Sequence, residues 1–375
     1  MATEVLTIFG ERSYDDVVGR AAGVLTAGGL VAFPTETVYG VGASAGDGDA
    51  LGRLRQVKNR PEGKPFTVHL GRRSDVERFV PSLSSVGRRL TTKGWPGPLT
   101  LIFDVADPSK AAVAEALSAE QMQAVYHEGT VGMRCPDDPV ALDLLSRVEA
   151  PVVAASANAA GRPPALCLDE VLAELEGKID LVVDAGPSRY ATPSTIVRVN
   201  GERYDIVREG VFDARTLRRL ASVNVLFICT GNTCRSPMAE ALCRRMLAKR
   251  LACGEEDLEQ RGYGVASAGA FAFAGAPASG GARDVMSARN VDVSAHRSQP
   301  MTVELIHQAD YIFTMCGSHR DEVISLVPAA EGRTQLLSTD GKDIVDPVGG
   351  GDDTYTTCAD TIERALERRL AEILA

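Results

Sequence analysis

A cysteine and an arginine lie six residues apart, between an aliphatic run and the start of a helical pattern. Residues 225–237 read VLFICTGNTCRSP, so a buried strand brings Cys229 to its carboxyl end, and Ser236 and Pro237 suit the first turn of a helix. Such a loop directs consecutive backbone N–H groups inward, and the helix start adds partial positive charge. The pattern predicts a cradle for a phosphoryl group.

The cradle contains the residue types that phosphoryl transfer through a covalent intermediate needs. Arg235 can bind two phosphoryl oxygens through its planar guanidinium. Inward N–H groups and a nearby cation stabilise a thiolate, so we expect Cys229 to be ionised at neutral pH and to attack phosphorus. Ser236 would donate a hydrogen bond to the sulfur, and the Asn232 amide would hold the shape of the loop. The other members of the cradle are Thr230, Gly231, Thr233 and Cys234.

In-line displacement also needs a proton donor for the leaving group. Asp346 is our candidate, because Pro347 stiffens the loop after it and the following glycines let that loop approach the cradle. Asp343 lies close by but lacks a rigid neighbour. A lone Cys-x5-Arg is more often a core cysteine before a surface turn. Here the strand, the Gly-Asn turn, the Ser-Pro helix start and the Asp-Pro loop occur together, which favours a cysteine-dependent phosphatase.

The second part of the chain resembles the low-molecular-weight protein phosphatases over nearly its full length. The cradle sequence carries the resemblance, together with SAG at 267–269, DVSAHRS at 292–298, ADYIFTM at 309–315 and DP at 346–347. The resemblance implies a phosphoprotein substrate, a phosphocysteine intermediate on Cys229, phosphate binding by Arg235 and general-acid catalysis by Asp346. It implies no cofactor.

Two positions bear on the identity of the phosphorylated residue. Tyrosine phosphatases of this family usually carry a bulky aliphatic residue where this chain has Thr233, and aromatic residues where it has VGG at 348–350. Thr233 and the two glycines are more similar to the bacterial protein-arginine phosphatases. They favour phosphoarginine over phosphotyrosine.

Cysteine chemistry suggests two further hypotheses. Arsenate reductases share the cradle, but they need redox cysteines on a mobile segment, and Cys316 and Cys358 are not arranged in that way. A reversible disulfide between Cys229 and Cys234 would protect the nucleophile from over-oxidation.

In the first 220 residues, polar groups follow several expected strands. No P-loop and no usable GxGxxG follows a strand there, so a nucleotide site must be built in another way. The candidate sequences are PTETVYG at 34–40, KNRPEGKP at 58–65, WPGPLT at 95–100, TVGMR at 130–134 and SAN at 156–158. Each alone has a simple structural explanation, such as a solvated loop or a helix cap.

Residues 15–212 resemble the YrdC-type threonylcarbamoyl-AMP synthases. The resemblance rests on PTETVYG, KNRPEGKP, WPGPLT and SAN together with REG at 208–210, in the family's order. The resemblance implies ATP, bicarbonate and L-threonine as substrates, Mg²⁺ with the ATP, and tRNA-modifying machinery that uses the product. Its implied threonine contacts are Thr35, His69, Arg134 and Ser194. Its implied ATP contacts are Lys58, Arg60, Lys64, Thr130, Ser156, Asn158 and Arg208. Pro164 departs from the family, which often has a serine there near the nucleotide. That departure leaves open a catalytically inactive first half.

The elements that must position these residues indicate two α/β domains, at 1–220 and 221–375, because 375 residues exceed what one core usually serves. In the first we expect a mixed α/β sheet domain of the YrdC type. Its strands are expected at 30–33, 66–70, 99–103, 131–134, 152–155, 181–183, 194–199 and 204–208, and its helices at 15–30, 51–57, 74–79, 140–147 and 169–176. In the second we expect a doubly wound parallel sheet. Its strands are expected at 223–228, 265–267, 311–315 and 335–337, and its helices at 237–251, 281–289, 302–309 and 355–373.

Composition limits the remaining alternatives. The net charge of −10 argues against an RNA-binding module as the role of the first half. No apolar stretch approaches ~20 residues and no signal peptide is apparent, so we expect a cytoplasmic protein with no membrane partner. The eight cysteines contain no Cys-x-x-Cys pair, and we therefore expect reduced thiols and no metal site.

Overall fold

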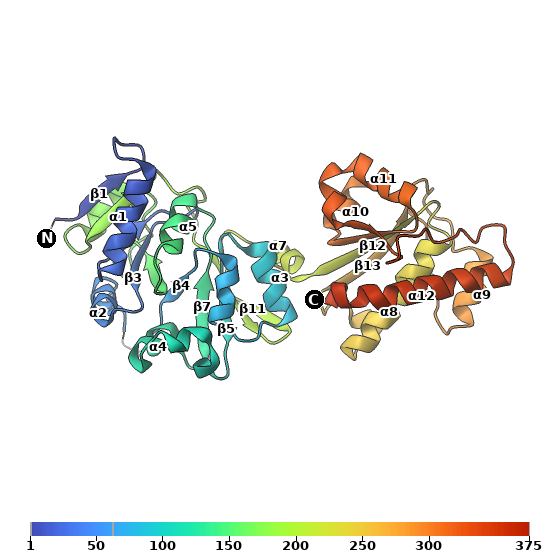
Figure 1. Cartoon of the computed structure of the whole chain (residues 1–375), viewed down its shortest axis with the longest axis horizontal. Helices are drawn as coiled ribbons and strands as arrows, with labels where there is room; N and C mark the ends of the chain where they lie inside the picture. The colour runs from blue at the N-terminus through green and yellow to red at the C-terminus, as the bar shows by residue number, and fades with distance from the viewer. Residues whose placement is uncertain (1, 62–63, 375) are drawn as a thin grey trace. The chain divides into compact units, whose positions relative to one another are not determined.

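The part of the chain that the computed structural model describes, residues 2–61 and 64–374, forms two units. The first unit spans Met1–Ala221 and the second spans Ser222–Ala375. Figure 1 shows that each unit has its own sheet with helices packed on it. None of the helices within the described ranges combines the length and the apolar composition that crossing a bilayer would demand.

The first unit is built on a mixed sheet, as the sequence predicts. Its described strands run in the order β1-β9-β2-β3-β8-β4-β7-β5-β10-β11, with β6 paired to β7. They are β1 (Glu4–Thr7), β2 (Val31–Phe33), β3 (Gly40–Ser44), β4 (Thr67–His69), β5 (Leu99–Asp104), β6 (Tyr126–His127), β7 (Thr130–Arg134), β8 (Val152–Ser156), β9 (Leu181–Asp184), β10 (Thr195–Asn200) and β11 (Arg203–Arg208). The sheet contains both parallel pairs, such as β4–β7, and antiparallel pairs, such as β4–β8.

The helices of this unit cover the sheet unequally. They are α1 (Tyr14–Thr26), α2 (Gly48–Val57), α3 (Ser85–Gly94), α4 (Ala119–Val125), α5 (Pro139–Ser146), α6 (Leu168–Leu175) and α7 (Ala214–Ala221), with short 3-10 helices at Arg73–Arg78, Pro108–Lys110 and Ala112–Glu115. Helices α1 and α5 pack with Val31, Phe33 and Val152 on one face, whereas a larger core that includes Val68, Leu101 and Met133 covers the other. The core formed by α1 and α5 does not extend to β7 and β5. The face of the sheet that α1 and α5 cover is therefore more open at β7 and β5.

Several elements of the first unit differ from the predictions. The expected helix at 74–79 is a 3-10 helix, and β3, α3 and α4 were not expected. The sequence GVGAS of β3 reads as a loop because of its glycines, yet the glycines are what lets the strand form. A Cβ on Gly42 would lie 3.0 Å from the ring of Phe33 and 3.2 Å from the Val152 side chain, so a larger residue there would have to displace these neighbours.

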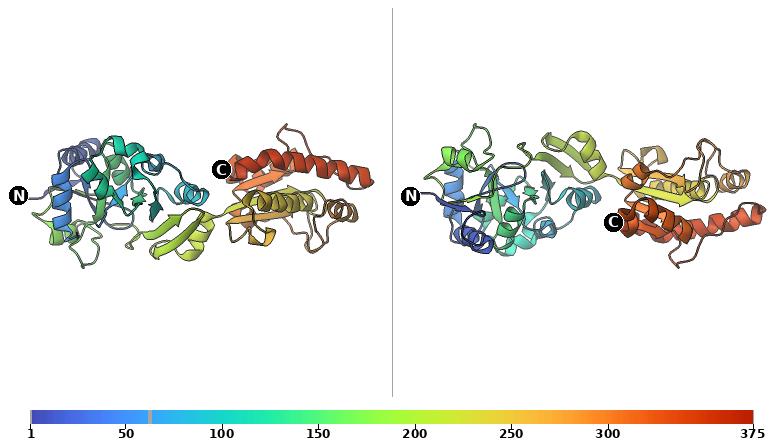
Figure 2. Two further views of the ribbon diagram at one scale, coloured as in Figure 1. Left: turned by 90° about the horizontal axis from the view of Figure 1, so that it is seen from below. Right: turned by 90° about the horizontal axis from the view of Figure 1, so that it is seen from above.

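The second unit is a doubly wound parallel sheet, as predicted. Its described strands run in the order β13-β12-β14-β15 and pair in parallel, with bounds β12 (Val223–Cys229), β13 (Tyr263–Gly269), β14 (Tyr311–Thr314) and β15 (Thr334–Leu336). Helices α8 (Arg235–Leu251), α9 (Gly280–Ser287) and α12 (Asp352–Leu374) belong to one core, and α10 (Val303–Gln308) and α11 (Gly317–Leu326) to the core on the other face. Figure 1 shows these two layers on either side of β12 and β13, and Figure 2 shows the same helices from below and from above. Short 3-10 helices lie at Glu255–Asp257 and Pro328–Arg333.

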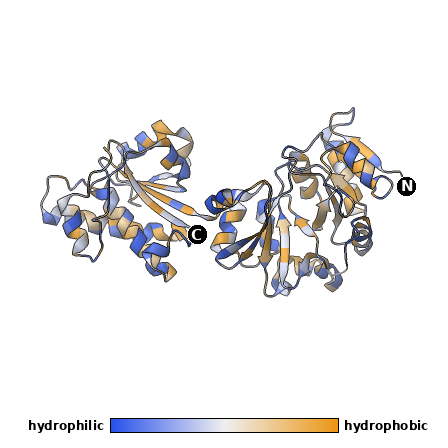
Figure 3. Cartoon of the chain, turned by 180° about the vertical axis from the view of Figure 1, so that it is seen from behind, coloured by the Kyte–Doolittle hydropathy of each residue, from blue (hydrophilic) through white to orange (hydrophobic). Residues whose placement is uncertain are grey.

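Strand β12 is central in this sheet, and all but one of its seven residues are buried. The surrounding helices carry both polar and apolar residues (Figure 3). Helix α11 was not predicted from the sequence GSHRDEVISL, whose apolar residues are too few to give a clear helical period. The carboxyl ends of β12 and β14 lie side by side, since Ile228 pairs with Thr314. Ligands of doubly wound sheets bind at such an edge.

Candidate active sites

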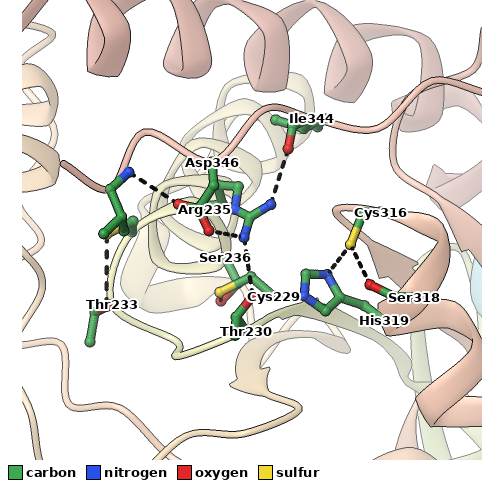
Figure 4. Close-up of polar contacts among 12 residues, drawn as sticks. Cys229, Thr230, Thr233, Arg235, Ser236, Cys316, Ser318, His319, Ile344 and Asp346 are labelled. Atoms are coloured by element: carbon green, nitrogen blue, oxygen red, sulfur yellow. Dashed lines mark hydrogen bonds and ion pairs between the residues drawn. The ribbon is translucent and has the colours of Figure 1, made fainter. Parts of the chain in front are cut away.

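Cys229 is the last residue of β12 and is almost fully buried, with 3% of its surface exposed. Its Sγ lies 3.0 Å from the Ser236 Oγ and accepts the backbone N–H of Asn232 at 3.3 Å. The 17-residue helix α8 begins six residues later at Arg235, so its partial positive charge is at the same place. The sulfur therefore lies beside one backbone N–H that donates to it and one hydroxyl that can do so (Figure 4).

Asn232 holds the loop between the strand and the helix. Its φ of 54° is a left-handed conformation that asparagine tolerates better than most residues, and its side chain is fully buried. The side-chain nitrogen donates to the hydroxyls of Ser236 (2.9 Å) and Ser267 (2.8 Å), and the side-chain oxygen accepts from the Gln299 N–H (2.8 Å). With every polar atom of the amide engaged, the curvature of the loop is determined by the protein rather than by a ligand.

Arg235 contacts the Asp346 loop directly. Its Nη1 donates to the Ile344 carbonyl (3.1 Å), and its Nη2 donates to the Thr230 Oγ1 (3.2 Å) and forms an ion pair with the Asp346 carboxylate. Arg235 is 5% exposed, and its Nε has no hydrogen-bond partner in the described part of the chain. A phosphoryl group would therefore find one unused donor, and it would displace the exposed Asp346 carboxylate from the guanidinium. Cys229, Arg235 and Asp346 are thus brought together, as the sequence suggested.

Thr233 and Cys234 complete the cradle at its outer side. Thr233 is half-buried, and its carbonyl accepts from the Ser279 N–H (2.8 Å). Cys234 is buried and donates its S–H to the Ser279 Oγ at 3.1 Å. Cys229 and Cys234 are both free thiols, so a disulfide between them remains a hypothesis that requires Cys234 to leave Ser279.

Sequence reasoning overlooked one residue that touches the cradle. His319 lies in the first turn of α11, and its Nε2 is 2.9 Å from the Thr230 Oγ1. A single histidine outside any motif gives no signal, and the helix that carries it was not predicted either. Cys358, weighed above as a redox cysteine, is buried, and burial raises the pKa of its thiol to about 12. It is therefore poorly suited to redox exchange.

In the first unit, alternate residues of the central strands leave one polar face. On β7, Val131 and Met133 point into the buried core, whereas Thr130 and Gly132 lie on the opposite face and are half-exposed. A Cβ on Gly132 would meet no atom closer than 3.9 Å, so there is space above this glycine. Thr67 on β4 and Ile102 on β5 are half-buried neighbours on the same face. This open face has a cluster of polar side chains at each end.

Arg134 is the centre of the first cluster. Its Nη2 lies 2.9 Å from the Glu36 Oε1, and both side chains are at least 94% buried. The contact is an ion pair but not an aligned hydrogen bond, because the Nε and Nη2 of Arg134 and both oxygens of Glu36 lack hydrogen-bond partners in the described ranges. A buried guanidinium with unused N–H groups is a suitable partner for a carboxylate ligand.

Three more of the expected site residues lie around Arg134. His69 pairs with Arg134 in the β4–β7 register. The Ser194 hydroxyl is 2.9 Å from the hydroxyl of Thr100, and its carbonyl accepts from the Arg208 Nη2 at 2.7 Å. Burial and the Arg134 charge lower the pKa of Arg208. Glu36 and Thr100 are members of this cluster that were not assigned a role from the sequence, although both lie in its motifs.

Thr35 lies next to Glu36 in the loop after β2. It is buried, and its hydroxyl donates to the Val38 carbonyl (2.6 Å) while it accepts backbone N–H groups of Thr37 and Val38 (3.3 Å each). These bonds fold the loop back on itself and so help to place Glu36 against Arg134.

His69 provides a pH-dependent test of this cluster. Burial and the Arg134 charge lower the pKa of His69 from 6.5 to about 3. Between pH 6.5 and pH 3 His69 binds a proton in the unfolded chain but not in the folded unit. Its contribution to the free energy of unfolding is therefore fully present above pH 6.5 and is lost as the pH falls toward 3. This effect lowers the free energy of unfolding by up to about 1.4 kcal/mol for each pH unit, and we expect His69→Gln to abolish it. Denaturant unfolding of both proteins from pH 7 to pH 4 measures this difference; parallel curves would contradict it.

The second cluster lies at the other end of the face. The Lys58 Nζ donates to the Ser156 carbonyl (2.7 Å) and to the Asn158 Oδ1 (3.0 Å), and burial together with Arg60 lowers its pKa to about 8. Lys58 therefore holds the SAN sequence in place. Arg60 stacks 4.8 Å above the Phe66 ring and donates to the Pro65 carbonyl.

Lys64 and Thr130 lie at the same end of the open face as Lys58, whereas Arg208 lies at the other end. Lys64 is exposed and follows residues 62–63, which lie outside the described residues. The Thr130 hydroxyl donates to the His127 carbonyl at 2.8 Å. Thr130 and Arg134 are the first and last residues of β7, so about 13 Å separates their positions along the strand. Of the residues expected to contact ATP, Arg208 alone joins the Arg134 cluster.

Two protein-family models match the chain in adjoining regions. Residues 23–210 match the Sua5/YciO/YrdC model, which is described as telomere recombination. Residues 224–375 match the model described as low molecular weight phosphotyrosine protein phosphatase.

Curated relatives match the first of these regions. The threonylcarbamoyl-AMP synthase of Pyrococcus abyssi is 34% identical over 187 residues, which are 50% of this chain and 52% of that protein. A putative threonylcarbamoyl-AMP synthase of Mycobacterium tuberculosis is 34% identical over 204 residues, 54% of this chain and 88% of that protein. The chain thus spans about half the length of some curated relatives that it matches.

Two solved structures are similar to parts of the chain. A variant of Sua5 from P. abyssi aligns with 72% of this chain and 91% of its own, at 23% identity and a TM-score of 0.51, which supports the shared fold of the synthase family. The YwlE arginine phosphatase from Geobacillus stearothermophilus is 36% identical, over 40% of this chain and 92% of its own, with a TM-score of 0.35.

Proposed function

The chain belongs to the Sua5/YciO/YrdC family, and we propose that its first unit makes L-threonylcarbamoyl-AMP from ATP, bicarbonate and L-threonine. The threonine amine would combine with bicarbonate and release water, and an oxygen of the resulting carbamate would attack the α-phosphorus of ATP. The bond to the β-phosphate breaks and pyrophosphate leaves. The product would serve tRNA-modifying machinery that forms threonylcarbamoyladenosine.

The open face between the two clusters supports this proposal. The unused N–H groups of Arg134 would bind the threonine carboxylate, with His69, Ser194 and Thr35 around the amino acid. Arg60, Lys64 and Thr130 at the other end would bind the nucleotide, and Lys58 would keep Ser156 and Asn158 in place to do so. Such a reaction depends on fixed positive charge and on orientation more than on a protein nucleophile.

Magnesium would enter this site with the nucleotide. The described residues hold no group of three or more His, Cys, Asp or Glu side chains that could bind a metal ion. Mg²⁺ usually keeps several waters and binds through substrate phosphates with few protein ligands, so ATP itself would supply its ligands. It would neutralise charge on the leaving pyrophosphate.

Pyrophosphate release tests the synthase against the RNA-binding alternative. A synthase releases pyrophosphate only when threonine, bicarbonate and ATP are all present. An RNA-binding module would show no such requirement and would instead bind tRNA with an affinity that falls steeply with salt.

For the second unit we propose a cysteine-dependent protein phosphatase. The observation that carries this is the Cys229 sulfur, which accepts the Asn232 N–H and lies 3.0 Å from Ser236, beside the guanidinium of Arg235. Cys229 would attack phosphorus while Asp346 protonates the leaving group, and water would then release phosphate from the phosphocysteine. In the ligand-free site Asp346 forms an ion pair with Arg235, and the arriving phosphoryl group would free it for that role.

We further propose phosphoarginine rather than phosphotyrosine as the substrate residue. Thr233 offers a small polar wall, and Val348 and the glycines after it offer no aromatic surface on which a phenol ring could stack. Replacing Thr233 with isoleucine should lower kcat/KM for a phosphoarginine peptide and raise it for a phosphotyrosine peptide, with the ratio changing by about tenfold or more. Kinetics on matched peptides measure this. Equal effects on both peptides would contradict the role of Thr233 in specificity.

A further inference from the structure

A chain of hydrogen bonds leads from helix α11 to the phosphate cradle. His319 is 3% exposed, and its Nε2 lies 2.9 Å from the Thr230 Oγ1 while its Nδ1 lies 3.0 Å from the Cys316 Sγ. Figure 4 shows the imidazole between the other two side chains, beside Cys229 and Arg235. The Thr230 Oγ1 also accepts from the Arg235 Nη2. We call Cys316, His319 and Thr230 the α11 relay.

The backbone holds the α11 relay rigidly against the cradle. Met315, directly before Cys316, donates its N–H to the Ile228 carbonyl at 3.0 Å, so the end of β14 is bonded to the end of β12. The Gly317 N–H donates to the Asp343 Oδ1 at 2.9 Å and ties the start of α11 to the loop that carries Asp346. The backbone on either side of Cys316 is therefore tied to the strand that bears the nucleophile and to the Asp346 loop.

The His319 imidazole can donate one hydrogen bond. Burial and the neighbouring Arg235 charge lower the pKa of His319 to about 4, so the ring is neutral near pH 7 and carries an N–H on one nitrogen only. If that N–H is on Nδ1, the Thr230 hydroxyl must donate to Nε2. If it is on Nε2, Thr230 accepts it, as it accepts from Arg235, and the hydroxyl hydrogen stays free.

The contact between Cys316 and Nδ1 allows one of these tautomers to be chosen. If the Cys316 S–H donates to Nδ1, the ring N–H is on Nε2. The Ser318 hydroxyl lies 3.1 Å from the same sulfur and can donate to it, so the S–H is left for the imidazole. In this arrangement the Thr230 hydroxyl keeps its hydrogen for a ligand of Arg235.

We propose that His319 and Cys316 are positioning residues for the phosphatase reaction, and that they hold the Thr230 hydroxyl as a donor to the phosphoryl group bound by Arg235. This rests on the phosphatase function proposed above. The phosphoryl oxygens gain charge in the transition state, so a donor fixed in advance contributes more to turnover than to ground-state binding. The effect should therefore appear mainly in kcat.

The test uses the full chain with p-nitrophenyl phosphate as substrate and inorganic phosphate as competitive inhibitor. His319→Ala should lower kcat about tenfold, the change expected from one lost hydrogen bond to a charged group, and raise KM less. His319→Gln should recover most of the loss, because its amide nitrogen can donate to Thr230. Cys316→Ala should lower kcat, and Cys316→Ser should lower it less, because a hydroxyl can still donate to Nδ1.

A second background separates the relay from a general loss of structure. In a Thr230→Val protein the hydroxyl is gone, so His319→Ala should cause no further decrease in kcat. Cys253→Ala, at a half-buried thiol after α8, is the matched control and should behave as the wild type. Thermal unfolding checks that each variant is folded.

Four results would overturn the proposal. His319→Ala could lower kcat as much in the Thr230→Val protein as in the wild type, or folded His319→Gln could be as slow as His319→Ala. All relay variants could also have the same kcat as an active wild type, which would contradict the role of the relay but not the phosphatase function. A wild type that neither hydrolyses p-nitrophenyl phosphate nor binds inorganic phosphate would overturn both the relay and the phosphatase function.

Discussion

Replacing Cys229 with serine is expected to reduce phosphatase turnover by at least about 1,000-fold and to leave threonine-dependent pyrophosphate release unchanged. A serine hydroxyl fits the same place and can keep the contact with Ser236, but it is far less ionised than a thiol in a cradle of donors. The fold should survive because the change is nearly isosteric. Steady-state kinetics on an aryl phosphate and a pyrophosphate assay on the same preparation measure the two activities.

The two assays also show whether the units act independently. Cys229 and the residues proposed for the synthase belong to different units of the chain, so the loss should be confined to one activity. Cys253→Ser is the control for a cysteine outside the cradle. Phosphatase activity that persisted within tenfold of the wild type would refute Cys229 as nucleophile. Loss of both activities in a folded protein would show that the sites are coupled.

Replacing Arg134 with alanine should both destabilise the first unit and abolish threonine-dependent activity. The Glu36 carboxylate, 1% exposed, would be left buried without its ion-pair partner, which typically costs about 3–5 kcal/mol. The guanidinium donors proposed for the threonine carboxylate would also be lost. Denaturant unfolding and pyrophosphate release at saturating ATP measure the two consequences.

A pair of further variants distinguishes the structural effect from the binding effect. Glu36→Gln combined with Arg134→Gln removes both charges, so most of the stability should return while activity stays lost. Arg134→Lys keeps the charge but not the planar fork, and it should raise KM for threonine by about tenfold or more. Full activity in the folded double variant would show that Arg134 has a structural role only.

The fold of both units was largely predictable from local patterns. Aliphatic runs such as that of β12, and turn residues between them, gave the mixed sheet and the doubly wound sheet correctly. Two elements that were not predicted, β3 and α11, share a cause. Strand β3 contains two glycines that lie next to the ring of Phe33 and is paired on both sides, and the sequence of α11 lacks a clear apolar period. In both, tertiary packing rather than local preference decides the conformation.

The candidate sites were predictable to different degrees. Cys229 and Arg235 belong to one strand–loop–helix segment, so their proximity follows from local geometry. The synthase residues came from motif order alone, and no local rule could place Arg208 beside Arg134 instead of near Lys58. That arrangement depends on how β11 and β7 are ordered in the sheet.

What the sequence determined by itself is therefore the chemistry of short segments: a thiol, an arginine and a ring of N–H groups whose positions differ by only a few bonds. What only the tertiary structure decided are the contacts between distant segments. Asp346 reaches Arg235 across 111 residues, His319 reaches Thr230 across 89, and Glu36 pairs with Arg134 inside a core. Backbone geometry limits short segments to few arrangements, whereas long-range contacts depend on how whole strands and helices bury their apolar faces together.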